Sequence, residues 1–382
     1  MPPEGADAKR FHSPSGGPVF PAGGDIKGNG AITDYERLCA FDSLYEAHRK
    51  ARRCKRQKAD VISFEMNLAE NLWDCKRRLD GKTYTVNGYH RFMIHDPKDR
   101  EIQALAYADR VVQHSLCDNV LSPFFEKHLI YDNCACRIGK GTHFGMERLT
   151  GFLREHYREY GAEGWILKAD VRKYFPSVDH EVLLARLRKV ISDPDVRALL
   201  EMIVRSWNGE EGKGLPMGNQ SSQLFALYYL DPVDRLVKEK LRIKHYTSYM
   251  DDMVLIHPDR DYLRECLLQM RELCESKLKL ELNEKTQVFP LRHGVDYLGW
   301  HFYLTDTGKV IKKLRTTNKK RLKRRMKGLQ AGYAEGRLQW EDVRRSLAST
   351  NGHLIHGDTY HLRTKIYRDT AFIRKNGEES SY

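Results

Sequence analysis

Apolar positions in the first third of the chain recur with a helical period. A helix starting near Tyr35 is predicted to carry one apolar face made of Leu38, Phe41, Leu44, Tyr45 and His48. A second amphipathic helix, from Val61 to Leu79, is predicted to turn four residues inward: Phe64, Leu68, Leu72 and Trp73. Two β-rich runs flank residues 95–99 and predict a hairpin, after which residues 108–130 return to the helical pattern.

From Trp165 the chain changes to short apolar runs of strand type. The run WILKADV ends at Asp170, and YTSYMDDMVLIH predicts two strands joined by a tight turn. Between them, Ser221 or Ser222 can cap a helix, and Asp231-Pro232 predicts that this helix breaks and restarts. The other elements expected here are helices over Val182–Ile191 and Tyr262–Leu278, and strands around Leu280–Leu282, Val288–Pro290 and Tyr297–Tyr303.

Composition narrows the class of protein. The chain has 382 residues, 41% of them hydrophobic, which is enough apolar content for two or three packed subdomains. Lys and Arg number 65 against 52 Asp and Glu, and the resulting net charge of +13 favours a polyanionic partner, most often nucleic acid. We expect no transmembrane helix and no secretory signal, a flexible segment over residues 1–30, and reduced cysteines rather than a disulfide framework or a zinc site.

Three aspartates stand where core packing does not require them. Asp170 closes an apolar strand, and Asp251-Asp252 occupy the tip of the predicted hairpin. Like charges this close repel each other unless a cation lies between them. Mg²⁺ is held by one or two carboxylates together with substrate phosphates, and a pair of such ions promotes phosphoryl transfer. Asp170 taken alone could equally be a cap or turn residue, but the three together form the smallest constellation for a two-metal site.

Five segments resemble the palm motifs of reverse transcriptases in order and spacing: ILKADVRKYFPSVD, GLPMGNQSSQLFALYYLD, YTSYMDDMVLIH, LKLELNEKT and DYLGWHF. Upstream, DPKDREIQALAYADRVVQHSLC and CACRIGKGTHFG resemble the fingers motifs of the bacterial, group II intron-like branch. Within that branch, KGTH, SLASTNGHLIHGDTYHL and the core of Gly218, Asn219, Ser222 and Gln223 are most similar to the reverse transcriptases of diversity-generating retroelements. The resemblance covers roughly residues 85–360.

The resemblance implies an α+β fold of the right-hand polymerase type. Residues 31–164 would form the fingers with N-terminal helices, residues 165–310 a palm of antiparallel sheet backed by helices, and residues 311–382 a basic helical thumb and tail. The implied activity is RNA-directed DNA polymerisation, in which a dNTP is joined to a 3′-hydroxyl while a retroelement RNA is copied. The implied cofactor is a pair of Mg²⁺ ions, for which Mn²⁺ can substitute.

Family roles carry over to individual residues. Asp170 and Asp251 would be the principal metal ligands, with Asp252 a weaker or outer ligand. Lys285 would protonate the leaving pyrophosphate, or is a plain sheet-edge lysine. Phe175 would exclude a ribose 2′-hydroxyl, or is an ordinary core aromatic. The other nucleotide-binding residues implied are Lys98, Arg100, Arg110, Arg137, Lys140, Val171, Met217 and Gln223.

The five cations in that set belong to the fingers motifs that clamp the triphosphate. Any one of them could instead be a solvated surface charge, and we expect two or three to touch the nucleotide. Met217 stands where processive retroviral enzymes carry a glutamine. The resemblance therefore implies an error-prone enzyme at template adenines, with Met217, together with Arg100, as the candidate cause.

The last part of the chain is predicted to be a basic helix. Ten Lys or Arg and no Asp or Glu lie between Lys312 and Lys327. So many uncompensated cations on one helix repel each other, which favours contact with a template–primer backbone. The nucleic-acid-binding residues predicted are Lys312, Lys313, Arg315, Lys319, Lys320, Arg321, Lys323 and Arg324. His353, His356 and His361 fit no zinc motif and are interpreted as thumb packing or RNA contacts.

Two other functions share parts of this pattern. A defence-associated reverse transcriptase of the unknown-group class would carry the same motifs and work with a noncoding RNA against phage. A catalytically idle RNA-binding scaffold is disfavoured by the intact aspartates. The expected partners are template RNA, the cDNA product, dNTPs and either a small accessory RNA-binding protein or a noncoding RNA, with no membrane. The expected setting is the cytoplasm, for a bacterial or phage-encoded protein.

Overall fold

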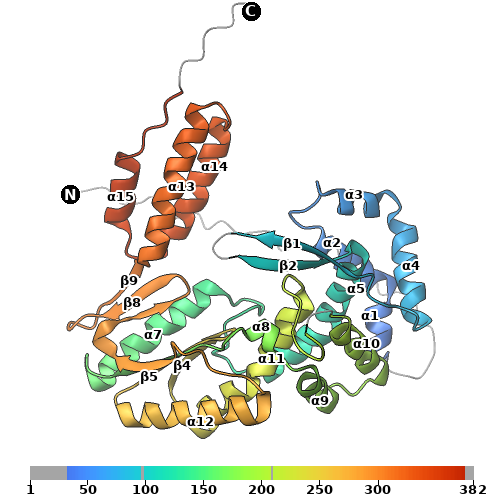
Figure 1. Cartoon of the computed structure of the whole chain (residues 1–382), viewed down its shortest axis with the longest axis horizontal. Helices are drawn as coiled ribbons and strands as arrows, with labels where there is room; N and C mark the ends of the chain where they lie inside the picture. Colours follow the sequence, from blue (N-terminus) through green and yellow to red (C-terminus); the bar gives the residue numbers. More distant parts are fainter. Residues whose placement is uncertain (1–31, 96–98, 208–209, 375–382) are drawn as a thin grey trace, which may run out of the picture. The chain divides into compact units, whose positions relative to one another are not determined.

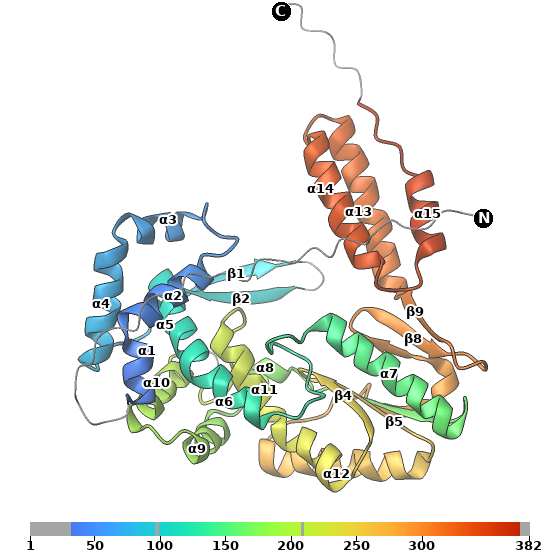
Figure 2. The ribbon, with the colours of Figure 1, turned by 180° about the vertical axis from the view of Figure 1, so that it is seen from behind.

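A computed structural model describes residues 32–95, 99–207 and 210–374 (Figures 1 and 2). The residues from Thr33 onward belong to one compact unit. The segment expected to be flexible, residues 1–30, lies outside the described residues, as does Lys98. Among the helices of the described ranges, none combines the length and the apolar character needed to cross a bilayer.

The N-terminal region consists mainly of short helices. They are α1 (Asp34–Cys39), α2 (Phe41–Ala51), α3 (Ala59–Met66), α4 (Leu68–Asp80), α5 (Tyr107–Leu116), a π-helical turn (Cys117–Leu121) and α6 (Ser122–His128). The helix predicted over Val61–Leu79 is interrupted at Asn67, and the prediction that Trp73 points inward is wrong, because its side chain is 50% exposed. Leu72 and Leu79 define the buried face of α4, and each residue turns the helix by about 100°, so position 73 falls at the edge of that face.

The predicted hairpin is present as β1 (Tyr89–Ile94) paired antiparallel with β2 (Arg100–Leu105). Its base is tied to a distant loop, because the backbone N–H of Gln103 donates to the carbonyl oxygen of Met217 at 3.1 Å. The hairpin is therefore fixed against the segment that carries Met217.

A four-stranded antiparallel sheet forms the centre, in the order β4-β5-β3-β6; its strands β4 and β5 are labelled in Figure 2. Its strands are β3 (Trp165–Ala169), β4 (His245–Tyr249), β5 (Asp252–His257) and β6 (Gln287–Pro290). Ile166 packs with residues of α7 (Thr142–Tyr160), whereas the next residue, Leu167, packs with residues of α12 (Arg260–Leu278). Burial on both faces explains why these strands read as continuous apolar runs rather than alternating ones.

Helices α8 (Tyr174–Ser177), α9 (His180–Val190), α10 (Pro194–Arg205) and α11 (Gln220–Arg235) complete this part of the fold. The predicted break at Asp231-Pro232 is wrong, since α11 runs through Pro232. A proline cannot donate to the carbonyl four residues back, here that of Tyr228. The guanidinium of Arg186 donates to that oxygen at 3.0 Å instead, and this substitute bond allows the helix to continue. Ser221 and Ser222 lie inside the first turn, and Asn219 holds the cap position.

The C-terminal part begins with a three-stranded sheet of β7 (Val295–Tyr297), β8 (Trp300–Leu304) and β9 (Val310–Leu314). Three helices follow: α13 (Thr316–Ala334), α14 (Trp340–Leu354) and α15 (Tyr360–Arg368). The expectation of one basic helix from residue 312 is wrong at its start, because Lys312 and Lys313 lie in β9 and α13 begins only at Thr316. Pairing with β8 and burial of Val310 and Leu314 outweigh the helical pattern. The predicted domain boundary at residue 311 therefore cuts through a strand.

The helical C-terminal part is seated on β8 and β9 through close backbone contacts. The N–H of Asp358 donates to the carbonyl of Lys312 at 2.8 Å, and the N–H of Lys312 donates to the Asp358 carboxylate at 2.8 Å. A Cβ added at Gly357 would lie 2.0 Å from Cζ3 of Trp300, so only glycine fits against that ring. The ring of His353 also lies 5.3 Å from the ring of Trp300.

Candidate active site

The β4–β5 hairpin places two adjacent carboxylates at its tip. Tyr249 pairs with Asp252, so Met250 and Asp251 form a two-residue turn. Met250 has a φ of 56°, in the left-handed region that residues other than glycine rarely adopt. Strained backbone of this kind persists where the surrounding structure imposes it, and it is frequent at functional sites.

Asp170 reaches the same place from the neighbouring strand. Ala169 pairs with Met253, so the next residue of β3, Asp170, arrives beside the start of β5. The carboxyl groups of Asp170 and Asp251 lie close enough to interact directly. Burial, followed by the nearby Asp170 charge, raises the pKa of Asp251 to about 6. Two acidic groups held this close favour either a shared proton or a cation between them.

These residues fit Mg²⁺ because the hard carboxylate oxygens of Asp170 and Asp251, which this ion prefers, converge at one place. The third carboxylate, that of Asp252, instead accepts a hydrogen bond from the ammonium of Lys168. Within the three described ranges, no three His, Cys, Asp or Glu side chains are grouped as a complete metal centre. Two carboxylates would leave the remaining ligand positions to water and substrate phosphates.

Lys168 is a functional candidate that the sequence reasoning missed. Its ammonium pairs with Asp252 and lies 4.9 Å from the centre of the Tyr297 ring. Burial lowers the pKa of Lys168 to about 7, although the Asp170 charge opposes that shift. Residues two apart on a strand point to the same face of the sheet. The predicted strand that ends at Asp170 therefore already implied that Lys168 lies on the same face as Asp170.

The loop between α12 and β6 orients Asp170. The side-chain amide of Asn283 donates to Oδ2 of Asp170 at 3.1 Å, and the backbone N–H of Asn283 donates to its carbonyl oxygen at 2.7 Å. The N–H of Asp170 donates to Oγ1 of Thr286 at 3.3 Å. Asn283 also accepts from the backbone N–H of Lys285 at 3.0 Å. Lys285 is exposed and joined to Asp170 through one intervening residue, Asn283.

The predicted gate and fidelity residues lie on connected segments. Phe175 is half-buried, and its carbonyl oxygen accepts from the N–H of Leu215 at 2.9 Å. Met217, two residues further along, is half-buried and bonded to β2 through Gln103. The structure thus links the segment of Phe175, the segment of Met217 and the hairpin that carries Arg100.

Two other predicted nucleotide-binding residues differ in exposure. Val171 is 2% exposed and forms a β-bridge with Leu282, so its side chain packs in the core. Gln223 is exposed on α11, and its side-chain oxygen accepts from the thiol of Cys136 at 3.4 Å. Of these two residues, Gln223 presents its side chain to solvent and Val171 does not.

The predicted triphosphate clamp is largely engaged in the fold. The guanidinium of Arg137, whose side chain is 6% exposed, donates to the carboxylate of Glu126 and to the carbonyl oxygens of Glu126, Ile130 and Asn133. These acceptors occupy its donors, and they brace the loop that carries Arg137. Arg110 donates to Asp60 and, at 3.0 Å, to the carbonyl of Leu105.

Lys140 and Arg100 complete the described part of that clamp. The ammonium of Lys140 donates to the carbonyl of Tyr131 at 2.6 Å and lies 4.5 Å from the centre of that ring. Burial lowers the pKa of Lys140. Arg100 is exposed at the start of β2. Of the four clamp cations in the described ranges, Arg100 therefore has the most accessible charge.

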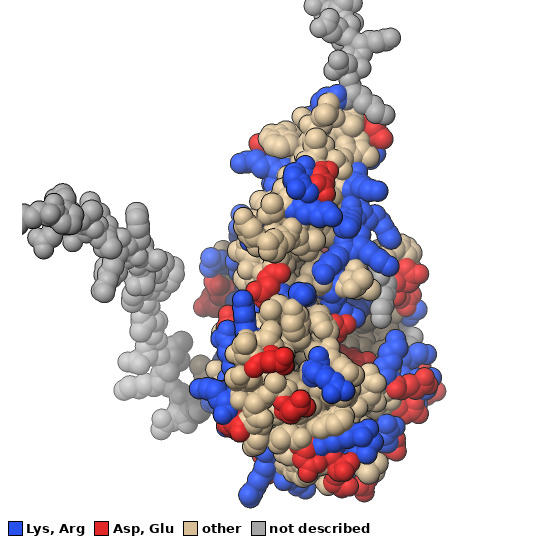
Figure 3. Space-filling model, turned by 90° about the vertical axis from the view of Figure 1, so that its left-hand side faces the viewer, with Lys and Arg blue, Asp and Glu red and all other residues tan. Residues whose placement is uncertain are grey.

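Helix α13 carries many of the exposed cations of the C-terminal part. Figure 3 shows Lys and Arg side chains gathered over this upper part of the molecule. Lys320, Lys323 and Arg324 are exposed, and no carboxylate in the described ranges forms an ion pair with them. Arg315, at the N-cap of α13, pairs with Asp296 at 2.9 Å. Arg315 is thus committed to the junction with the sheet, unlike the cations further along the helix.

Comparison with known proteins identifies a shared region. Residues 94–302 match the model of the family described as reverse transcriptase (RNA-dependent DNA polymerase). Protein YkfC of Escherichia coli K12 is 24% identical over 241 residues, which cover 53% of this chain and 62% of that protein. The putative COX1/OXI3 intron 2 protein of Saccharomyces cerevisiae is 24% identical over 132 residues, or 32% of this chain and 15% of that protein.

Two further similarities are more partial. The Gag-Pro-Pol polyprotein of mouse mammary tumor virus is 25% identical over 167 residues, which cover 42% of this chain and 9% of the polyprotein. Among solved structures, telomerase from Candida albicans in complex with a telomeric RNA fragment aligns with a TM-score of 0.42 and 13% identity, covering 74% of this chain and 55% of that one. The chain thus spans less than two thirds of each of these curated relatives.

Proposed function

The chain belongs to the reverse transcriptase family, and on that premise we propose that it is an RNA-directed DNA polymerase that makes cDNA from a retroelement RNA. The observation that carries this proposal is the contact between the Asp170 and Asp251 carboxyl groups, brought together from two strands. A scaffold that only bound RNA would have no need to hold two acidic groups so close together.

The reaction joins a dNTP to a primer. The 3′-hydroxyl oxygen bonds to the α-phosphorus, its proton is lost to water, and the bond from the α-phosphorus to the bridging oxygen breaks as pyrophosphate leaves with the electron pair. Asp170 and Asp251 would hold Mg²⁺, which supplies charge stabilisation for the attacking and leaving oxygens. Asn283 holds the Asp170 carboxylate in one orientation. Lys285 lies on the same loop as a candidate proton donor to the leaving group.

The nucleotide would be a deoxynucleotide. Phe175 is held by its backbone bond to Leu215, and its ring packs edge-on to Tyr174 at 5.9 Å. A bulky ring fixed in this way supports the proposed exclusion of a ribose 2′-hydroxyl. The proposed site would therefore favour dNTPs over NTPs.

A groove lined mainly by residues of the N-terminal region supports the proposal that the template is RNA. It measures about 500 Å³, and its lining includes Lys55, Lys58, His90, Phe92 and Gly218. The groove reaches Gly218 directly after Met217, the residue expected near the templating base. Cations beside aromatic side chains suit a single strand, because phosphates meet the charges and bases stack on the rings.

The proposed subtype is an error-prone enzyme of a diversity-generating retroelement. Its support is Met217, whose thioether cannot donate the hydrogen bond that a glutamine amide would make. We expect Met217→Gln to lower misincorporation opposite template adenines more than opposite other bases. Sequencing of cDNA from the variant and the wild type measures this. Identical adenine error spectra would remove the subtype's physical basis while leaving the polymerase assignment intact.

The polymerase assignment is tested by primer extension. The full-length chain, an RNA template with a DNA primer, dNTPs and Mg²⁺ should yield cDNA, and Asp251→Asn should lower the rate by more than about 10²-fold. Circular dichroism and thermal unfolding of the variant check its fold. Asp261→Asn, at an exposed position on α12, is the matched control and should retain the parental rate. Equal rates for Asp251→Asn and wild type would overturn the proposal.

A further inference from the structure

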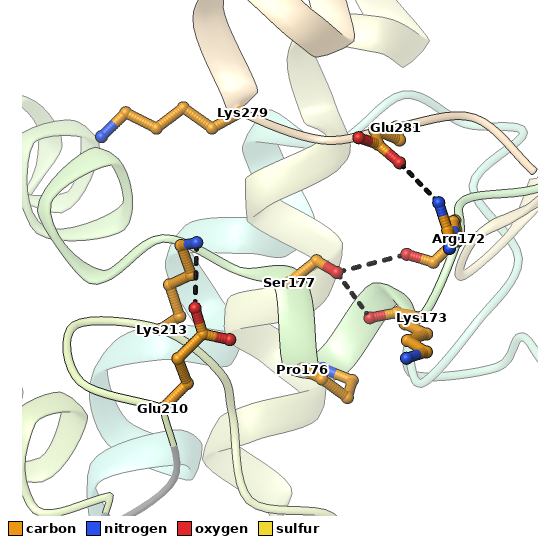
Figure 4. Close-up of a pocket in the computed structure, with 8 residues that line it drawn as sticks. All are labelled: Arg172, Lys173, Pro176, Ser177, Glu210, Lys213, Lys279 and Glu281. Atoms are coloured by element: carbon orange, nitrogen blue, oxygen red, sulfur yellow. Dashed lines mark hydrogen bonds and ion pairs between the residues drawn. The ribbon is translucent and has the colours of Figure 1, made fainter.

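A cavity opens just beyond the first catalytic aspartate. Its volume is about 350 Å³, and Figure 4 shows the residues that line it: Arg172, Lys173, Pro176, Ser177, Glu210, Lys213, Lys279 and Glu281. The sequence reasoning assigned no role to any of them. They come from the segment after β3, the loop before α11 and the loop after α12.

The backbone that fixes Asp170 also builds one wall of this cavity. Asn283 donates to the Asp170 carbonyl, Val171 forms a bridge with Leu282, and the N–H of Arg172 donates to the carbonyl of Glu281 at 2.9 Å. Residues two apart on extended backbone are roughly 7 Å apart and point to the same face. Arg172 therefore follows Asp170 along the same face at the distance of a short polyphosphate.

Four cations face only two carboxylates across the cavity. Arg172 pairs with Glu281 at 3.0 Å, and Lys213 pairs with Glu210 at 3.2 Å. Lys279 reaches out of the cavity to Asp179 at 2.7 Å. The ammonium of Lys173 has no carboxylate partner among the described residues, and no interaction of it is drawn in Figure 4. The cavity therefore carries a positive surplus centred on Lys173.

The backbone holds Lys173 in an unusual conformation. Its φ is 45°, in the left-handed region, where side chains other than glycine are strained. The hydroxyl of Ser177 donates to the carbonyl oxygens of Arg172 and Lys173, at 3.3 and 2.9 Å, and so braces this turn. The turn therefore holds the backbone of Lys173 in one conformation at the edge of the cavity.

The cavity also provides accessible charge in addition to that of Arg100, the most accessible cation of the predicted clamp. Arg137 and Arg110 are committed to internal partners. Arg172 and Lys173 stand two and three residues after Asp170 in the chain. We propose that this cavity is a polyphosphate site that receives the inorganic pyrophosphate released by nucleotidyl transfer. This inference rests on the proposed function for the source of its ligand, and the cations would bind the anion by charge-assisted hydrogen bonds.

Direct binding is the first test. Inorganic pyrophosphate is titrated into the full-length chain by calorimetry in metal-free buffer. Lys173→Gln should raise the dissociation constant by about 10-fold, because it removes one charge-assisted hydrogen bond. Lys173→Asn, which tolerates the left-handed backbone, and Lys213→Gln provide second and third variants if the first unfolds. Lys189→Gln, an exposed residue of α9 outside the cavity, is the control for the loss of one positive charge.

Product inhibition is the second test. Pyrophosphate is added to primer extension, and each variant's inhibition is expressed relative to its own uninhibited rate. We expect the concentration for half inhibition to rise by about 10-fold in Lys173→Gln and to stay at the parental value in Lys189→Gln, matching the binding result. Equal affinities in Lys173→Gln and wild type, or an equal loss in Lys189→Gln, would overturn the site.

The two proposals fail separately. Asp251→Asn removes a catalytic carboxylate but leaves the cavity intact, so it should still bind pyrophosphate. If wild type binds pyrophosphate through Lys173 but extends no primer, the polymerase assignment fails and the anion site stands. If wild type extends primers and Lys173 variants bind pyrophosphate normally, the anion site fails by itself. Inorganic phosphate in a parallel titration should bind more weakly than pyrophosphate, and equal or tighter binding would contradict a polyphosphate site.

Discussion

The end of β3 and the surface of α13 both concentrate charge, but in contrasting ways. At the end of β3, each charged group has its own partner: Asp170 is held by Asn283, and Asp252 is held by Lys168. On α13, cations such as Lys320 and Lys323 are exposed and pair with no carboxylate in the described ranges. The role of the first region therefore depends on the positions of individual side chains. The role of the second depends on its total charge, whose interactions are screened by salt.

The largest expected effect separates the aspartates of the first region. Asp170→Asn should lower the rate of primer extension by more than about 10²-fold, because it removes one of the two converging carboxylates. Asp252→Asn should cost about 10-fold less than Asp170→Asn, since the Asp252 charge is already compensated by Lys168. Single-turnover rates at saturating Mg²⁺ measure both. Equal losses would mean that Asp252 is a ligand of the same rank and that the Lys168 pair does not persist during catalysis.

The next effect concerns Asn283 as a positioning residue. Asn283→Leu should lower activity by about 10- to 100-fold, the usual consequence of losing a group that orients a metal ligand. Binding of Mn²⁺, followed by electron paramagnetic resonance, should weaken in parallel. Glu284→Gln, at the exposed neighbouring position, is the control. If Asn283→Leu binds Mn²⁺ as wild type does, the loss of activity has another origin.

The α13 cations should act as a group. The triple variant Lys320→Gln, Lys323→Gln, Arg324→Gln should make template–primer affinity less dependent on salt. The slope of log affinity against log salt concentration should become shallower by roughly 0.9 for each duplex phosphate that is no longer neutralised. Fluorescence anisotropy between low and high salt measures the slope. A triple variant of Lys189, Arg271 and Lys277, exposed on α9 and α12, removes equal charge elsewhere. The same slope change in both variants would contradict a specific role for α13.

The smallest effect is the pH dependence of a buried palm residue. His245, 3% exposed at the start of β4, has its pKa lowered to about 4 by burial. Between pH 6.5 and 4, the unfolded chain binds a proton at this position that the folded chain does not, so the free energy of unfolding falls as the pH falls. His245→Phe should flatten this part of the curve from urea denaturation, whereas His361→Gln, at an exposed position, should not. Parallel curves for wild type and His245→Phe would exclude the linkage.

The palm hairpin was predictable because its signals are local. Strand, turn and strand follow one another within YTSYMDDMVLIH, and the alternation of β3 fixes the direction of Asp170. Asn283 was not predictable, because it lies 113 positions from Asp170 and meets it only through tertiary packing. The only sequence signal for Asn283 was its place in the segment LKLELNEKT, in which a role had been given to Lys285.

Predictions from local sequence could not include partners that distant residues supply. The helix through Pro232 continues because Arg186 donates to the freed carbonyl. Lys312 and Lys313 extend as a strand because β8 offers an edge to pair with. For Arg110 and Arg137, the sequence shows that each residue is charged, but not that Asp60 and Glu126 pair with them in the fold.

In the proposed polymerase, the fit of Gly357 against Trp300 would affect how long a cDNA grows in one encounter with its template. A Cβ at this position would collide with the indole ring, so any other residue would push α15 and its neighbours off the strands that seat them. The basic helix would then be held only by its own contacts with the sheet, such as the bond from the Asn318 amide to the carbonyl oxygen of Gly299. Each addition would carry a greater chance of release, and the products would shorten even though the chemistry of a single step was untouched.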